Sequence, residues 1–143
     1  LLIDETHTIS TSPGGYTRAF GLEPDLFVLG KPVAGGVPAS VWGFTDDVAR
    51  RLDAVREQTP PGHSGMGTTL SANALSLAAM RATLEHVMTA EAYAHMESLA
   101  ARLARGLQRV LTTYGVSSHV VRVGARIELI CAPGPLRRER CRS

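Results

Sequence analysis

The sequence predicts an α/β fold in which a mainly parallel sheet, flanked by helices, is followed by a second, smaller α+β unit. Two apolar runs, residues 1–5 and 25–30, are continuous rather than alternating, which is typical of parallel strands covered on both faces. Helical patterns over residues 71–87 and 90–114 supply the helices that such a sheet needs. Two short apolar runs around Gly124 predict a hairpin in the smaller unit.

A third strand and a short helix are predicted to follow the second apolar run. Residues 37–44 have the composition of the strand, and residues 45–53 that of the helix, with Thr45 or Asp46 as its N-cap. Residues 54–69 are rich in proline and glycine and are predicted to form a loop.

The two longer helices carry their own boundary signals. Ser71 is the predicted cap of the first helix, and Thr89 that of the second. Glu91 lies in the first turn of the second helix, where the helix dipole favours an anion, and Gly115 is its predicted stop. Close packing is expected on an alanine-rich face of the first helix and a leucine stripe of the second: Ala72, Ala78, Ala79 and Ala82, and Leu99, Leu103, Leu107 and Leu111.

Lys31 is the only lysine among fifteen basic side chains, the other fourteen being arginine. It follows the apolar run that ends at Gly30. A lysine can lose its proton and form an imine with an aldehyde, which an arginine cannot readily do. Lys31 is therefore a candidate nucleophile. The alternative is that the genome favours arginine codons and that Lys31 is incidental.

Asp4 lies at the end of the first apolar run, as Lys31 lies at the end of the second. In open α/β sheets, ligands collect at the carboxyl ends of the strands. Pyridoxal phosphate chemistry requires a lysine that holds the aldehyde and a carboxylate that keeps the pyridine nitrogen protonated. Asp4 and Lys31 fit these two roles, although Asp4 could instead be satisfied by backbone donors. Glu5 is expected to anchor the neighbouring loops.

Four motifs, in this order, resemble the class III aminotransferases. They are Leu-Ile-Asp-Glu-Thr-His-Thr at residues 2–8, Pro-Asp-Leu-Phe-Val-Leu-Gly-Lys at 24–31, Gly-Gly-Val-Pro at 35–38, and Gly-Thr-Thr-Leu-Ser-Ala-Asn-Ala at 67–74. The resemblance spans residues 1–132 and leans toward the glutamate-1-semialdehyde aminomutase-like branch of the family. It implies a fragment of a fold-type I pyridoxal-phosphate transferase, because a whole member of the family is about three times longer.

The resemblance also implies a domain division. Residues 1–87 would be the C-terminal part of the large cofactor-binding domain, and residues 88–136 the connecting helix and the start of the small α+β domain. Residues 137–143 form an irregular tail without apolar periodicity.

The family's functional residues carry over to five positions. Lys31 would form the internal aldimine with pyridoxal 5′-phosphate and move a proton between substrate carbons, and Asp4 would pair with the pyridine nitrogen. Thr69, supported by Thr68, would bind the cofactor phosphate of the partner subunit across a homodimer interface. On local grounds the two threonines could equally be an ordinary loop before a helix. His7 lies where many relatives carry glutamine near the cofactor's 3-hydroxyl, so this contact departs from the family pattern.

The implied activity is amino transfer between a small-molecule amino donor and a carbonyl acceptor, either a keto acid or an aldehyde. One alternative keeps the same site but exchanges the amino group within one molecule, as an aminomutase does. A third hypothesis, of a different class, is a non-catalytic truncated relic.

Composition argues against several other classes of protein. The tail at residues 137–143 contributes +3 to a net charge of +2, so the rest of the chain carries −1 and offers no basic surface for nucleic acid. No apolar run approaches the roughly 20 residues of a membrane span, and no signal peptide is visible. Two cysteines give no disulfide framework, so we expect a cytoplasmic protein. The histidines show no metal-ligand spacing, and the P-loop pattern is absent.

Overall fold

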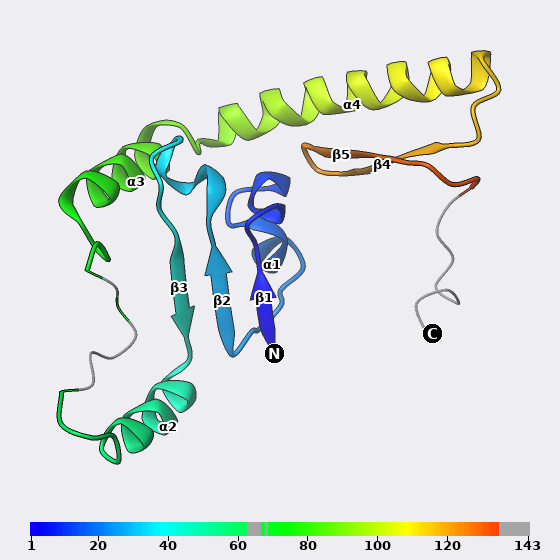
Figure 1. Ribbon diagram of the computed structural model, residues 1–143. Helices are drawn as coiled ribbons and strands as arrows, with labels where there is room; N and C mark the ends of the chain where they lie inside the picture. Colours follow the sequence, from blue (N-terminus) through cyan, green and yellow to red (C-terminus); the bar gives the residue numbers. More distant parts are fainter. Residues whose placement is uncertain (63–66, 68, 135–143) are drawn as a thin grey trace.

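The computed structural model describes residues 1–62, 67 and 69–134, and these residues form two small sheets and the helices around them (Figure 1). The first sheet has the strand order β1-β2-β3, with β1 at Leu2–Asp4, β2 at Leu26–Leu29 and β3 at Val41–Phe44. The second sheet is the hairpin of β4 (His119–Val123) and β5 (Arg126–Ile130).

Strands β1 and β2 are parallel, as their continuous apolar runs predict. Asp4 lies opposite Val28, and the Glu5 N–H donates to the Val28 carbonyl at 2.8 Å. The carboxyl ends of both strands point toward the end of the sheet where α3 and α4 meet (Figure 1). The parallel pair therefore brings the residues that follow the two strands to one edge.

Strand β3 is shorter than predicted and is antiparallel to β2. The predicted strand began at Val37, but the Val37 N–H is used in a turn, where it donates to the Ala34 carbonyl at 3.1 Å. Pro38 has no N–H, and its carbonyl accepts from the Ser76 hydroxyl at 3.1 Å. These residues have hydrogen-bond partners outside the sheet, so pairing begins only at Val41.

The core lies where β2, the short 3₁₀ helix η2 (Lys31–Ala34) and α3 (Ala74–His86) meet. Val33 and Ala34 of η2 are 1% and 2% exposed, so this element is fixed against the sheet and the helix. The other core residues are Ile9 and Leu29, with partly buried Phe27, Val37, Ala39, Val41, Ala79, Met80 and Met88 packed around them.

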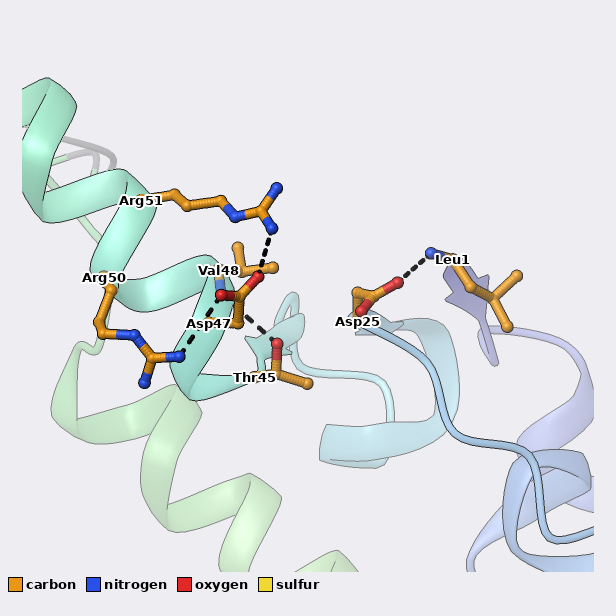
Figure 2. Close-up of polar contacts among 7 residues, drawn as sticks. All are labelled: Leu1, Asp25, Thr45, Asp47, Val48, Arg50 and Arg51. Carbon is orange, nitrogen blue, oxygen red and sulfur yellow. Dashed lines mark hydrogen bonds and ion pairs between the residues drawn. The ribbon is translucent and has the colours of Figure 1, made fainter.

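Helix α2 (Asp46–Arg56) begins at the predicted cap and runs three residues past its predicted end. The Val48 N–H donates to the Thr45 hydroxyl oxygen, and Asp47 forms ion pairs with Arg50 at 3.4 Å and Arg51 at 2.8 Å (Figure 2). Exposed pairs of this kind stabilise a helix only modestly. Figure 2 also shows the amino group of Leu1 paired with Asp25, which ties the start of β1 to the start of β2.

Helix α3 begins at Ala74 rather than near Ser71, and its cap is Asn73. The Asn73 side chain accepts from the Ser76 N–H at 2.9 Å. Ala72 adopts a left-handed φ of 55°, which prevents the helix from starting earlier. Of the predicted alanine face only Ala79 packs against the core, because Ala78 and Ala82 are exposed and Ala72 lies outside the helix. The buried face carries Ser76, Ala79, Met80 and Thr83.

Helix α4 (Ala90–Thr113) begins after Thr89, whose hydroxyl accepts from the Ala92 N–H at 3.3 Å, as predicted. The predicted leucine stripe is only half right: Leu111 is buried, but Leu99 and Leu103 are 43% and 55% exposed. A four-residue repeat advances about 40° more than a full turn at each step, so it leaves one face within a few turns. The buried positions are Tyr93, Ala100 and Leu111.

The hairpin lies along α4 and reaches the N-terminal segment (Figure 1). Tyr93 of α4 donates its hydroxyl to the Ile9 carbonyl at 2.8 Å, within the short 3₁₀ helix η1 (Thr8–Thr11). Gly124, in the hairpin turn, packs against Thr11 so closely that a Cβ would lie 2.4 Å from the Thr11 Cα. In the described part of the chain, no helix is both long and apolar enough to cross a bilayer.

Candidate active site at the ends of the parallel strands

Asp4 and Lys31 lie at the same edge of the sheet, as the sequence predicts. Asp4 is the last residue of β1, and Lys31 follows the end of β2 by two residues. Both side chains are exposed. The Asp4 carboxylate accepts from the Thr6 N–H at 2.8 Å. It retains further oxygen lone pairs for a ligand, because a carboxylate has about four acceptor sites.

The pKa of Asp4 is below its ordinary value of 3.8. Hydrogen bonds from the Thr6 hydroxyl and the Thr6 N–H are the main causes of this lowering. Desolvation raises the pKa of Asp4 by less, and the positive charges of Lys31 and His7 lower it slightly further. Asp4 is therefore ionised at neutral pH, as a carboxylate that stabilises a protonated ring nitrogen must be.

The backbone of Lys31 has an unusual conformation. Its φ is 46°, in the left-handed region that non-glycine residues rarely adopt. Such strain costs of order 1–3 kcal/mol and is found mainly at functional sites. Pro32 and the buried Val33 and Ala34 follow directly, so the lysine backbone is fixed while its side chain is exposed.

His7 lies beside Lys31, with its Nε2 at 3.1 Å from the lysine Nζ. The other ring nitrogen, Nδ1, contacts a guanidinium nitrogen of Arg126, from the first position of β5. The structure thus adds Arg126 to the predicted group. It is 119 positions from His7, and a single sequence holds no local signal that would connect them.

Glu5 anchors the neighbouring loops, as predicted, and is 0% exposed. It accepts from the Thr8 hydroxyl and the Thr17 N–H, and from the Tyr16 N–H at 3.2 Å, which ties η1 to α1 (Gly15–Ala19). Burial raises the pKa of Glu5, but these hydrogen bonds outweigh it, so the pKa lies below the ordinary value of 4.5.

The predicted role of Thr69, binding the cofactor phosphate of a partner subunit, stays a prediction. Thr69 lies in an exposed turn between α2 and α3, and within the described ranges no hydrogen bond or ion pair joins it to Asp4, His7 or Lys31. Thr68 lies outside the described residues, as does the tail at 137–143. Among the residues that the structure describes, no group of three acidic, histidine or cysteine side chains could hold a metal ion.

The family model for class-III aminotransferases matches residues 1–132, and the chain belongs to this family. It is 38% identical over 138 residues to a glutamate-1-semialdehyde 2,1-aminomutase from Thermus thermophilus, a match that covers 95% of the chain and 31% of the relative. A similar enzyme from Thermomicrobium roseum is 36% identical over 137 residues, covering 95% of the chain and 30% of the relative.

Solved structures agree with the family match. A crystal structure of a glutamate-1-semialdehyde-aminomutase from Pseudomonas aeruginosa PAO1 in complex with PMP is 51% identical, with a TM-score of 0.84. The match covers 94% of the chain and 30% of that protein. A β-phenylalanine aminotransferase from Variovorax paradoxus is 26% identical with a TM-score of 0.77, over 96% of the chain and 31% of that protein.

These comparisons confirm the resemblance and the α/β, fold-type I class that it implied. The chain spans about 30% of the length of the relatives it matches. The domain boundaries at residues 87 and 136, and the roles of the individual site residues, stay predictions.

Proposed function

We propose that the protein containing this chain binds pyridoxal phosphate at the Asp4–Lys31 edge and uses it to move an amino group. The observation that carries the proposal is the pair itself: an ionised carboxylate ends one strand, and the chain's only lysine follows the adjacent parallel strand. These two side chains fit the cofactor, because Asp4 supplies an anion for the ring nitrogen and Lys31 supplies a primary amine for the aldehyde. A relative that is 51% identical was solved with PMP, which is the aminated form of this cofactor.

Bound pyridoxal phosphate supplies an aldehyde and a pyridine ring that withdraws electrons from the substrate's α-carbon. Lys31 Nζ would be the primary amine that holds the cofactor through its aldehyde carbon, and it would also move a proton at the substrate's α-carbon. Asp4 would pair with the ring nitrogen and favour its protonated form, and its pKa below 3.8 leaves the carboxylate ionised at neutral pH. His7 lies close enough to Lys31 Nζ, at 3.1 Å, to contact the same cofactor.

The remaining roles follow the family pattern. Thr69, supported by Thr68, binds the cofactor phosphate of the partner subunit in a homodimer. The exposed position of Thr69 leaves it accessible to a second subunit. The substrates are a small-molecule amino donor and a carbonyl acceptor. The enzyme works in the cytoplasm, where Cys131, which is free and exposed, would stay reduced.

Trapping the lysine adduct tests the cofactor assignment directly. Borohydride reduction of the full-length protein with pyridoxal phosphate should attach the cofactor to one peptide, and mass spectrometry should place it on Lys31. Because this chain has no second lysine, the peptide is unambiguous within it. The Lys31→Ala variant should lose both the adduct and the visible absorption band of the loaded protein. Retention of that band in Lys31→Ala would refute the assignment.

An aminomutase is the second candidate, and the glutamate-1-semialdehyde aminomutases among the matched relatives favour it. The two activities differ in whether a separate carbonyl acceptor is needed. Glutamate 1-semialdehyde supplied without an acceptor should isomerise if the protein is an aminomutase. Turnover only when a keto acid or aldehyde is added would instead establish an aminotransferase.

A further inference from the structure

Thr6 contacts both sides of the candidate catalytic edge. Its N–H donates to the Asp4 carboxylate at 2.8 Å. Its side chain packs on Gly30, the buried residue directly before Lys31. A Cβ at Gly30 would lie 3.5 Å from Thr6 Oγ1 and 3.9 Å from Thr6 Cγ2, which is ordinary van der Waals contact. One residue therefore joins the end of β1 to the end of β2.

The register of the parallel strands explains why Thr6 reaches Gly30. Asp4 lies opposite Val28, and side chains two positions apart along a strand point to the same face. Two residues further along both segments, Thr6 and Gly30 meet on the face that carries Asp4. Because glycine has no side chain, the side chain of Thr6 lies directly over its backbone. Ser40 packs on the same glycine, with its Cβ 3.8 Å from the same point.

The hydroxyl of Thr6 adds a second hydrogen bond to Asp4, and this bond depends on the residue type. Most residues could supply the N–H bond, since an aspartate side chain readily accepts from the backbone two residues on. A hydroxyl on Cβ requires serine or threonine. The hydroxyl bond is the largest cause of the lowered pKa of Asp4, ahead of the N–H bond. Because Thr6 is β-branched and packs on Gly30, its side chain has few alternative rotamers.

We propose that Thr6 is a positioning residue, which holds the Asp4 carboxylate in one orientation at the edge that it shares with Lys31. An exposed side chain is otherwise free to rotate, and ordering it when a ligand binds costs conformational entropy. Two donors on one fixed residue order the carboxylate in advance. Since a carboxylate has about four acceptor sites, others stay free for a ring nitrogen. The orientation itself is independent of the cofactor, whereas its use in catalysis rests on the proposed function.

Crystal structures of the full-length protein without cofactor test the orientation of Asp4. Wild type, Thr6→Val and Thr6→Ser are compared, because valine keeps the shape and the backbone N–H but removes the hydroxyl. We expect a single Asp4 conformer bonded to both Thr6 donors in the wild type, more than one conformer in Thr6→Val, and a single conformer again in Thr6→Ser. A wild-type hydroxyl directed away from Asp4, or an unchanged Asp4 in Thr6→Val, would overturn the proposal.

Thr8→Val is the matched control. Thr8 is also partly buried and lies two residues further along, but its hydroxyl donates to Glu5 rather than to Asp4. The same substitution at this position should therefore leave Asp4 in its wild-type orientation. If Asp4 loses its single conformer in Thr8→Val as well, the effect is not specific to Thr6 and the proposal fails.

A double-mutant cycle tests whether Thr6 acts through Asp4. In the full-length enzyme, Thr6→Val should lower kcat about tenfold with little change in KM, which is the effect of one hydrogen bond to a charged group. In an Asp4→Asn background, Thr6→Val should cause no further fall, because the carboxylate that it orients is gone. An equal fall in both backgrounds would overturn the positioning role.

The two experiments also separate this inference from the proposed function. If the crystal structures show the expected orientations of Asp4 but the wild type never attaches pyridoxal phosphate at Lys31, the positioning of the carboxylate stands and the proposed function fails. If the cofactor attaches at Lys31 but Asp4 is unchanged in Thr6→Val, the proposed function stands and the role of Thr6 is wrong.

Discussion

Asp4 and Glu5 are consecutive carboxylates with opposite environments. Glu5 is fully buried, and its oxygens are used by donors from η1 and α1. Asp4 is exposed, and its carboxylate accepts a hydrogen bond from the N–H of Thr6, two residues further along the chain. Successive side chains of a strand point to opposite faces, so one residue of sequence separates an anchor of the fold from a group available to a ligand.

Both carboxylates have lowered pKa values, so pKa alone does not identify the functional one. The useful difference is how many lone pairs remain free. Glu5 accepts three hydrogen bonds from the protein, whereas Asp4 accepts from Thr6 alone and retains acceptor sites at the edge that carries Lys31. The comparison predicts that one carboxylate controls activity and the other controls stability.

Asp4→Asn should produce the largest effect on activity. The amide keeps the shape but no longer favours a protonated ring nitrogen, so kcat/KM of the full-length enzyme should fall roughly 10²- to 10³-fold. The melting temperature should stay at the wild-type value, because the exposed carboxylate contributes little packing. Near-normal turnover in this variant would contradict the prediction that Asp4, rather than Glu5, controls activity.

Glu5→Gln should show the reverse pattern. A buried amide offers fewer acceptor lone pairs and turns an N–H₂ group toward backbone donors, so the free energy of unfolding should fall by about 3 kcal/mol. Urea denaturation measures this loss. At low temperature, the folded fraction should keep its activity, in contrast to Asp4→Asn.

The stability difference between wild type and Glu5→Gln should also depend on pH. Because the folded-state pKa of Glu5 lies below its ordinary value of 4.5, the carboxylate stabilises the fold above that pH. This contribution is lost as the pH falls through the folded-state pKa. Denaturation curves of the two proteins should therefore converge in acid. A difference that grows in acid would contradict the sign of the shift.

Gly124→Ala should perturb the junction between the hairpin and the N-terminal segment. Its φ is 56°, and a Cβ would lie 2.4 Å from the Thr11 Cα, so we expect a loss of about 2 kcal/mol in the free energy of unfolding. Gly115→Ala is the control, because Gly115 has a similar φ of 62° and nothing within 4 Å. An equal loss in both variants would show that the close approach to Thr11 has no energetic effect.

The two helix caps should give the smallest effects, with a loss of about 1 kcal/mol in the free energy of unfolding for Asn73→Ala. Thr45→Ala at α2 should cost less, since its cap hydrogen bond is 3.5 Å long against 2.9 Å for Asn73. Thermal denaturation of the two variants compares them. A larger loss of stability in Thr45→Ala would mean that the length of the capping hydrogen bond does not determine which cap contributes more.

The sequence predicted that Asp4 and Lys31 share one edge of the sheet, because the determinants of their positions are local. A continuous apolar run indicates a buried parallel strand, and a charged residue at its end indicates where the side chain emerges. Asp4 and Lys31 needed no information beyond the two runs that precede them. The caps at Thr45 and Thr89 were predictable for the same reason.

Features that depend on the path of the chain were harder to predict. Ser71 and Asn73 are both acceptable caps by residue type, and the left-handed Ala72 between them decides which is used. Leu99 and Leu103 are apolar, yet the turn of the helix directs them away from the buried face of α4. Arg126 reaches His7 only because the hairpin folds back on η1.

A crystal structure of the full-length protein with pyridoxal phosphate tests the central claim most directly. We predict that a carboxylate oxygen of Asp4 lies within hydrogen-bond distance of the pyridine nitrogen, while Lys31 Nζ is bonded to the carbon that carried the aldehyde oxygen. A cofactor bound elsewhere, or held here with either side chain directed away from the ring, would contradict the account.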